Sequence, residues 1–199
     1  MAARPEQSDS RGLVPPEDAE VPRPHPDAPA PGSVLPPHHR QCFGCGDLHP
    51  HGLHLQMTVG EGVSVHGVLD VTESQQGAPG LAHGGLVAAA FDDVLGALSW
   101  VLRAPAVTGR LETDYLRPVP IGSRLFIHAR ATAVHGRKVY AEGEGHLDAP
   151  DGPVAARAAG LFVRVPPSHF LEHGRPQDVA RVREDPVLGG QLDAFEVGP

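Results

Sequence analysis

Lysine, cysteine and long apolar runs are scarce in this chain of 199 residues. Lys138 is the only lysine and the formal net charge is −8, so we expect no nucleic-acid partner, which would require a basic face. Cys42 and Cys45 are the only cysteines, and one such pair cannot build a disulfide framework. No run of about 18 apolar residues is present, so no membrane-spanning helix is expected. The first residues contain no apolar core of signal-peptide length, which makes the cytoplasm the expected location.

Proline is abundant, but it is concentrated at the beginning of the chain. Residues 1–37 hold ten of the 22 prolines and few large apolar side chains. Such a segment cannot bury enough surface to offset its ordering entropy, so we predict a disordered or extended arm. Residues 168–199 are again polar and acidic, and we predict a peripheral tail with a short helix at 176–183. The folded domain is therefore predicted to span residues 38–167.

Within that domain, the hydrophobic pattern predicts two strands, one long helix and four further strands. Residues 86–102 are rich in alanine, leucine and valine and contain no proline before Pro105, which is typical of a helix. The strand signals are short runs of alternating or continuous apolar residues bounded by turns, at 53–59, 63–69, 107–116, 123–134, 137–147 and 154–165.

The order of these elements predicts an α+β fold. A single helix that is apolar on nearly every side must be buried over most of its circumference. A curved antiparallel sheet wrapped around one long central helix would bury it in this way, and that arrangement is the hotdog fold. A ferredoxin-like sandwich would need a second helix between the later strands, and the sequence contains no signal for one.

Two glycines, Gly84 and Gly85, open the predicted helix directly after His83. Glycine lets a ligand approach the backbone closely, and the first amides of a helix have no partner within the helix. The amide of Gly85, or that of its neighbour, could therefore donate to a thioester carbonyl and stabilise an oxyanion. The alternative is a plain glycine-rich turn before a core helix.

Asp92 lies in the middle of the predicted helix among apolar residues, where a carboxylate is rarely buried without a partner or a task. Asp93 points about 100° away and is expected to be solvated or structural. Gly85 and Asp92 are seven residues apart, which is about 10 Å along a helix. Both can act on one carbonyl only if they come from two chains, as antiparallel helices across a two-fold axis would allow.

The residues from Gln76 to Gly85 (QGAPGLAHGG), followed by Asp92, resemble the PaaI-like and THEM4-like hotdog acyl-CoA thioesterases. The resemblance covers about residues 42–165. Further runs that match the family are CFGCG at 42–46, Gly52-Leu53, Thr108, YLRPVP at 115–120 and GRK at 136–138.

The resemblance implies a homodimer or a dimer of dimers that hydrolyses acyl-CoA to free acid and CoA without a metal or other cofactor. By this resemblance, Asp92 is the general base or the nucleophile, and the backbone of Gly85 activates the carbonyl. His83 and Gln76 match positions that help hold the thioester, and Thr108 matches a hydroxyl that orients water beside the acid.

Basic side chains are the candidates for the phosphates of CoA. The predicted substrate-binding residues are Arg117, Arg137 and Lys138, together with Gly84 at the helix start. Arginine binds phosphate in a bidentate manner, and lysine supplies a mobile charge. On spacing alone, residues 136–138 would be a solvated hairpin turn, and the resemblance favours the phosphate site.

The cysteine pair could instead belong to a metal site. Cys42 and Cys45 could be half of a zinc site, completed by one or more nearby histidines, namely His38, His39, His49, His51 or His54. A single pair of this kind is a weak signal. The alternative is small residues packed in a turn where the chain enters the fold, and this is the expectation.

Two other functions remain open from the sequence. One is a hotdog hydratase or dehydratase acting on enoyl or hydroxyacyl thioesters, although the order of histidine, glycines and acid fits hydrolysis better. The other is a non-catalytic acyl-CoA-binding module, in which Asp92 would be only a packing or dimer-contact residue.

Overall fold

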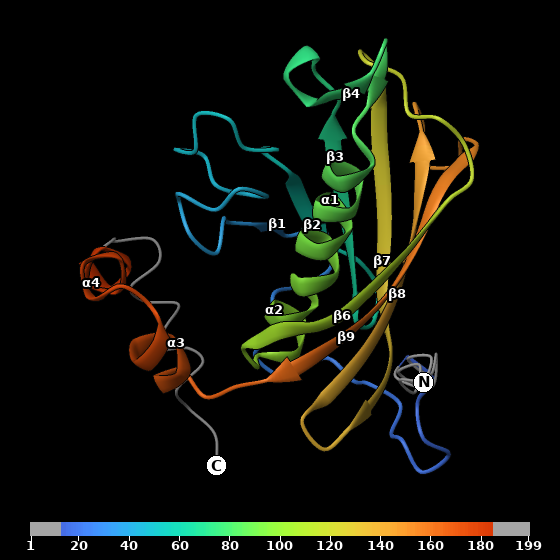
Figure 1. Cartoon of the computed structure of the whole chain (residues 1–199). Helices are drawn as coiled ribbons and strands as arrows, with labels where there is room; N and C mark the ends of the chain where they lie inside the picture. Colours follow the sequence, from blue (N-terminus) through green and yellow to red (C-terminus); the bar gives the residue numbers. More distant parts are fainter. Residues whose placement is uncertain (1–12, 185–199) are drawn as a thin grey trace, which may run out of the picture.

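The computed structural model describes residues 13–184 of the chain. One seven-stranded antiparallel sheet curves around a central helix, in the strand order β1-β2-β3-β7-β8-β9-β6 (Figure 1). A separate two-stranded hairpin, β4-β5, precedes the helix. The elements are β1 (Val34–Leu35), β2 (Gln56–Val59), β3 (Ser64–Asp70), η2 (Glu73–Gln75), β4 (Gln76–Ala78), β5 (Leu81–Ala82), α1 (Gly84–Gly96), α2 (Leu98–Leu102), β6 (Ala106–Tyr115), β7 (Arg124–His135), β8 (Lys138–Leu147), β9 (Val154–Arg164), α3 (Ser168–His173) and α4 (Pro176–Glu184).

The six predicted strands are all present, and the predicted hotdog architecture is confirmed. In β7, the alternation of Leu125, Ile127 and Ala129 places their side chains on the concave face, where each is at most 2% exposed. β3 pairs with β7, for example Val65 with Ala129, and alternates in the same way. The period-2 pattern therefore set both the existence of these strands and their inward faces.

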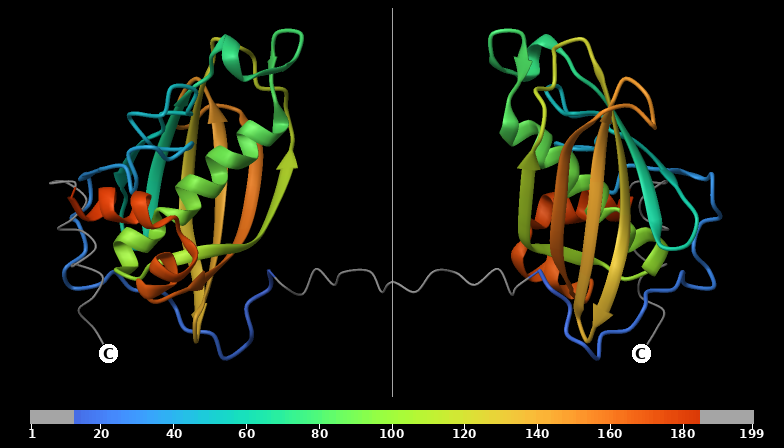
Figure 2. Two further views of the ribbon diagram at one scale, coloured as in Figure 1. Left: turned by 60° about the vertical axis from the view of Figure 1, so that its left-hand side comes forward. Right: turned by 90° about the vertical axis from the view of Figure 1, so that its right-hand side faces the viewer.

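The central helix lies diagonally across the hollow of the sheet (Figure 2). Its buried face includes Phe91 and Val94, both completely buried, and burial of side chains of this size contributes roughly 1.5–3 kcal/mol each. The sheet approaches so closely that a Cβ added at Gly67 would lie 2.4 Å from Cγ2 of Val94. A glycine in β3 is thus what allows the helix to seat against the sheet.

The helix differs in detail from the predicted 86–102. It begins two residues earlier, at Gly84, and is divided into α1 and α2 at Ala97. The residue before this division is Gly96, and glycine has the lowest helix propensity of all residue types except proline. An interruption of the helix at this place is consistent with that low propensity. The stretch Gly84–Leu102 is long and apolar enough to cross a membrane by length and composition alone, but a core helix passes the same test, and this one packs inside the sheet.

Residues 13–37 are part of the segment that was predicted to be a disordered or extended arm, and they contact the domain. Val34 and Leu35 form β1 and pair with Thr58 and Met57 of β2, and Leu35 is only 6% exposed. Farther back, the amide of His25 donates to a carbonyl of α2, at Val101. A few apolar side chains and backbone hydrogen bonds hold this proline-rich segment on the domain. Residues 1–12 of the predicted arm lie outside the described part.

The chain ends, as far as it is described, in two short helices beside the sheet, α3 and α4 (Figure 1). α4 (Pro176–Glu184) coincides with the short helix that the sequence indicated at 176–183. Its side chains are largely exposed, which agrees with a peripheral position. Residues 185–199 of the predicted tail lie outside the described part.

Candidate active site

His83 is the N-cap residue of α1. Its backbone is extended, and its Nδ1 accepts a 2.9 Å hydrogen bond from the amide of Gly85, while its carbonyl accepts from the amide of Leu86. The predicted oxyanion donor, the Gly85 amide, is thus paired with the predicted thioester-holding side chain, His83. The His83 ring is exposed, so its place can be taken by another acceptor. The amide of Gly84 has no hydrogen-bond acceptor among residues 13–184.

The β4-β5 hairpin positions His83 at the start of the helix. Gln76 pairs with Ala82 in this hairpin, and its side-chain Oε1 accepts from the amide of Gly80 at 3.1 Å. Gly80 has φ +72°, a conformation that favours glycine, so the tight turn depends on that residue. Gln76 therefore shapes the turn before His83, and its side chain makes no hydrogen bond to His83 itself.

Tyr115, at the end of β6, fixes the first turn of α1 from the other side. Its hydroxyl donates a 2.8 Å hydrogen bond to the carbonyl of Gly84. A cleft of about 310 Å³ opens at this place. It is lined by Ala78, Leu81, Ala82, Gly84, Val87, Tyr115, Leu116, Arg117, Pro118 and Val119. The contact of Tyr115 with Gly84 was not predicted, because the sequence does not show which strand end meets the helix.

Asp92 lies two turns further along α1 and is half-buried. Thr108 of β6 donates a 2.7 Å hydrogen bond from its hydroxyl to Oδ1 of Asp92. A β-bulge occurs in β6 between Thr108 and Arg110, and bulges of this kind commonly redirect a side chain near an active site. No other hydrogen bond to the Asp92 carboxylate occurs within the described part of the chain, so Oδ2 is available to a substrate or water.

The basic side chains predicted for CoA are not brought together within one chain. Arg117 donates to the carbonyl of Val154, where β9 begins, whereas the carbonyl of Arg137 accepts from the amide of Arg164, where β9 ends. The 11 residues of β9 separate these two places by about 33 Å. Lys138 pairs with Val163 and belongs to the same end as Arg137.

Asp93 lies on a different face of α1 from Asp92, as its position on the helix predicts, and it is partly buried. It lies against a loop that contains His38, Cys42 and Cys45. Burial raises the pKa of Asp93 to about 6, and the neighbouring Cys42 contributes to this shift. A hydrogen bond from Cys45 holds the pKa of Cys42 well below its usual value, and His38 acts in the same direction. These four side chains could together hold a metal ion.

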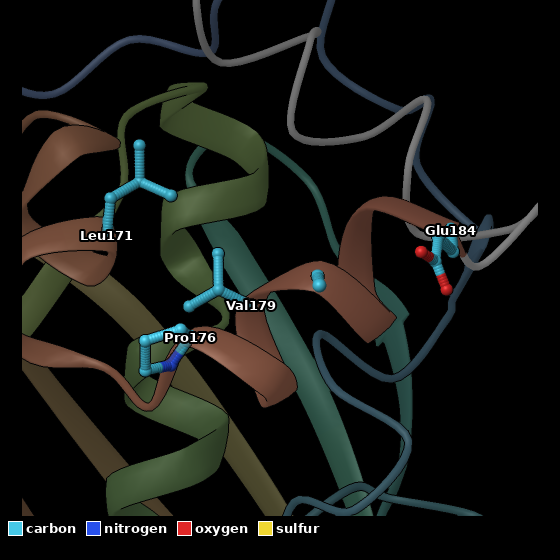
Figure 3. Close-up of a pocket in the computed structure, with 5 residues that line it drawn as sticks. Leu171, Pro176, Val179 and Glu184 are labelled. Carbon is cyan, nitrogen blue, oxygen red and sulfur yellow. The ribbon is translucent and has the colours of Figure 1, made fainter.

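Another hollow, of about 340 Å³, lies between α3 and α4 (Figure 3). It is lined by Leu171, Pro176, Val179, Ala180 and Glu184. Among the described residues that line it, Glu184 is the only ionisable one, and it lies at the rim (Figure 3). The described residues of this hollow provide neither a pair of free backbone amides for an oxyanion nor a base beside a place for the thioester carbon. The hollow therefore does not resemble a site for acyl transfer. The residues around His83 and Asp92 are therefore the candidate active site.

Known proteins resemble this chain over the segment that contains these residues. The family model of the thioesterase superfamily matches residues 79–152, which include His83, Asp92 and Thr108. The acyl-coenzyme A thioesterase THEM4 of Xenopus laevis is 30% identical over 92 residues, covering 46% of this chain and 41% of that protein. This chain therefore spans less than half of the length of that curated relative.

Solved structures agree with the fold. RHA08564, a thioesterase superfamily protein, is 29% identical with a TM-score of 0.58, covering 69% of this chain and 70% of its own. A variant of the phenylacetic acid degradation protein PaaI from Thermus thermophilus is 26% identical with a TM-score of 0.51, covering 57% and 95%. Residues 79–152 therefore match the thioesterase superfamily, and the fold is that of the hotdog proteins. Among the members of that superfamily, the chain is similar to PaaI and to THEM4.

Proposed function

We propose that this protein hydrolyses acyl-CoA thioesters to the free acid and CoA, with Asp92 as the general base or nucleophile. One observation carries this proposal. Asp92 is a carboxylate in the middle of an apolar central helix, and its only hydrogen bond among the described residues comes from the hydroxyl of Thr108. This geometry fixes Oδ1 and leaves Oδ2 free to react. The similarity to an acyl-CoA thioesterase over part of the chain supports the substrate class.

Two routes are compatible with this carboxylate. As a general base, Asp92 accepts a proton from water while the water oxygen attacks the thioester carbon. As a nucleophile, Asp92 itself attacks the carbon and forms an anhydride, which water then cleaves. In both routes the carbon–sulfur bond breaks, CoA leaves as the thiolate, and one water is consumed. Thr108 keeps the carboxylate oriented in either case.

The beginning of α1 supplies the positive potential that an oxyanion needs. The amides of Gly84 and Gly85 point outward from the first turn, and the helix dipole adds to their effect. In the structure, His83 accepts from the Gly85 amide at 2.9 Å. A thioester carbonyl would take over that donor, and the displaced His83 ring would lie beside the thioester. One such donor contributes ~3 kcal/mol to the transition state.

Gly85 and Asp92 are about 10 Å apart along one helix, so they can share a carbonyl only across two chains. Two features of the fold support a homodimer, with a dimer of dimers as a further step. Strand β6 is a ten-residue edge strand bonded only to β9 within the described sheet, and such an edge is suited to pairing with a second copy. On α1, Gly85 is exposed and Asp92 is only partly buried, although Asp92 contacts Thr108 of the chain's own sheet, so the face that carries them is open in part to a second chain.

The same two-fold arrangement would explain the separated basic residues. Arg117 lies where β9 begins, near the helix start, while Arg137 and Lys138 lie where β9 ends. If the helices of two chains run antiparallel, Arg117 of one chain and Arg137 of the other lie at the same end of the dimer. Each shared site would then have basic groups from both chains for the phosphates of CoA.

The proposal is tested by thiol release from a panel of acyl-CoA thioesters that differ in chain length and in aromatic character. We expect hydrolysis of at least one of them, and the product should be the free acid. Crotonyl-CoA, followed by both enoyl absorbance and thiol release, separates hydrolysis from hydration. Loss of enoyl absorbance without thiol release would identify a hydratase. Saturable binding without any reaction would identify a binding module, and either result would overturn the proposal.

A further inference from the structure

A four-residue cluster lies beside α1, about 100° around the helix from Asp92. It consists of His38, Cys42 and Cys45 from the loop before β2, and Asp93 from the helix. One ligand atom from each side chain lies within 4.8 Å of all the others. Cys45 Sγ is 3.1 Å from Nδ1 of His38, and Cys42 Sγ is 3.5 Å from Oδ1 of Asp93.

Asp93 is the residue in this cluster that ordinary packing does not explain. Its Oδ2 is buried and has no hydrogen-bond partner among the described residues. A buried carboxylate oxygen without a partner is costly. The loop nevertheless presses directly against it, because a Cβ added at Gly44 would lie 2.3 Å from the carboxylate carbon of Asp93. The backbone is therefore built to approach this carboxylate closely.

We infer that His38, Cys42, Cys45 and Asp93 bind a structural zinc ion. The donor set of two sulfurs, one nitrogen and one oxygen is the soft and borderline set that favours four-coordinate zinc. In a tetrahedral site with zinc–ligand bonds of about 2.0–2.3 Å, neighbouring ligand atoms are about 3.3–3.8 Å apart. Two of the separations, 3.1 and 3.5 Å, need shifts of only a few tenths of an ångström, and the widest, at most 4.8 Å, would have to close by about 1 Å on binding.

The surrounding backbone is arranged as the outer shell of such a site. The amide of Gly44 donates to Cys42 Sγ at 3.3 Å, and the amide of Gly46 donates to the carbonyl of Cys42 at 3.0 Å. The ring of His54 contacts the carbonyl of Gly46 at 3.0 Å. These bonds hold the turn between the two cysteines, and a backbone donor to sulfur stabilises a thiolate ligand.

From the sequence, the cysteine pair and the nearby histidines were only a weak signal for zinc, and packing of small residues in a turn was the expectation. The fold selects one histidine, His38, and adds a carboxylate from a helix 48 residues after Cys45. Four protein ligands close the coordination sphere, which is typical of a structural rather than a catalytic zinc. Because Asp93 directly follows Asp92, the ion would fix the rotation of α1 beside the candidate catalytic carboxylate. It takes no part in the hydrolysis.

Metal content of the whole purified chain tests this inference. The protein is loaded with zinc chloride under reducing conditions, desalted, and analysed by mass spectrometry of the elements. We expect about one zinc per chain in the unmodified protein and less than about a tenth of that in Cys42→Ser and Cys45→Ser. Asp93→Asn is compared with the matched variant Asp92→Asn, and His38→Ala with His39→Ala. The first of each pair should lose zinc, and the second should retain it.

Cobalt gives a second readout that does not depend on any variant being folded. Titration of the unmodified protein with cobalt chloride should produce the strong visible bands of tetrahedral coordination together with sulfur-to-cobalt charge transfer. Added zinc should remove them. A folded, reduced protein that retains no zinc and gives only the weak spectrum of octahedral cobalt would overturn the inference. A Cys42–Cys45 disulfide, found by mass spectrometry in protein purified without an oxidant, would overturn it as well.

Discussion

The hydroxyl of Thr108 is 2.7 Å from Oδ1 of Asp92, and this hydrogen bond joins the edge strand β6 to the middle of the central helix. The two residues are separated by 16 positions in the sequence. A bulge in β6 directly follows Thr108. A carboxylate held by one donor on one oxygen is oriented but not neutralised, which is the condition that a base or nucleophile requires.

Replacement of Asp92 by Asn should remove most of the hydrolysis and leave the fold intact. The amide has nearly the same shape, but it can neither accept a proton from water nor attack a thioester. General-base catalysis typically contributes 10²–10⁴-fold, so we expect kcat to fall by roughly that factor. The matched control is Asp114→Asn, an exposed carboxylate on β6, which should retain wild-type turnover. Circular dichroism and thermal melting establish that both variants are folded. Wild-type turnover by folded Asp92→Asn would disprove the catalytic assignment.

Thr108→Ala should lower kcat by about tenfold, because loss of one hydrogen bond to a charged group costs roughly 1.5–3 kcal/mol at most and only part of it is expressed in the transition state. Thr108→Ser keeps the donor and should recover most of the activity. The comparison uses initial rates of thiol release at saturating substrate. Equal activity in the alanine and serine variants would show that the hydroxyl does not orient Asp92 for reaction.

His83 has two separable roles, capping the helix and lying beside the thioester. In His83→Ala the amide of Gly85 loses its acceptor, and loss of an N-cap side chain costs about 0.5–2 kcal/mol of stability. Asparagine is a good N-cap residue, so His83→Asn should restore the free energy of unfolding. If His83 also holds the thioester, His83→Asn should remain defective in kcat/KM. Full activity in a stable His83→Asn variant would limit His83 to capping.

Most of the fold could be predicted from the sequence, because the strands of the domain alternate apolar and polar residues with a period of two. The sequence also placed Asp92 and Thr108 as functional candidates, which the structure brings into contact. It did not find β1, because Leu35 stands alone among prolines and gives no periodic signal. The sequence did not predict a partner for Asp93. The position of a residue on a helix gives the direction of its side chain, but it does not show which distant loop packs on that side. The pairing of Gly85 with His83 also depends on tertiary geometry.

Leu35 provides a test of whether the proline-rich segment belongs to the folded domain. Leu35→Ala should destabilise the protein by about 2 kcal/mol or more, because a buried leucine leaves a cavity when truncated. The adjacent Val34 is 76% exposed, whereas Leu35 is 6% exposed, so Val34→Ala is a matched control that should be nearly neutral. Denaturant unfolding measures both. Equal midpoints for the two variants would show that β1 is not part of the cooperative unit.

The final prediction concerns assembly, since the shared-site model requires Gly85 of one chain to act with Asp92 of another. One variant is Asp92→Asn, and the other is Gly85→Pro, which removes the amide donor in the first turn of the helix. Proline is tolerated in a first helical turn, so the second variant is expected to fold, and melting curves check this. Each variant alone should be nearly inactive. In a mixed dimer, however, one site combines both lesions, while the other retains an intact Gly85 and an intact Asp92.

Mixed dimers are obtained by co-expression with two different affinity tags and sequential purification on both. We expect them to recover about half of the wild-type activity per dimer, because one of the two equivalent sites is complete. The control is the pair Asp92→Asn and Thr108→Ala, whose lesions lie at the same contact in one chain. If Asp92 and Thr108 of each site come from the same chain, one site of this mixed dimer carries Asp92→Asn and is inactive. The other site carries Thr108→Ala, so the dimer should show at most the activity of one Thr108→Ala site. Inactive mixed dimers of Asp92→Asn and Gly85→Pro, with both parents folded and binding acyl-CoA, would show that the two residues do not act on one carbonyl across the interface.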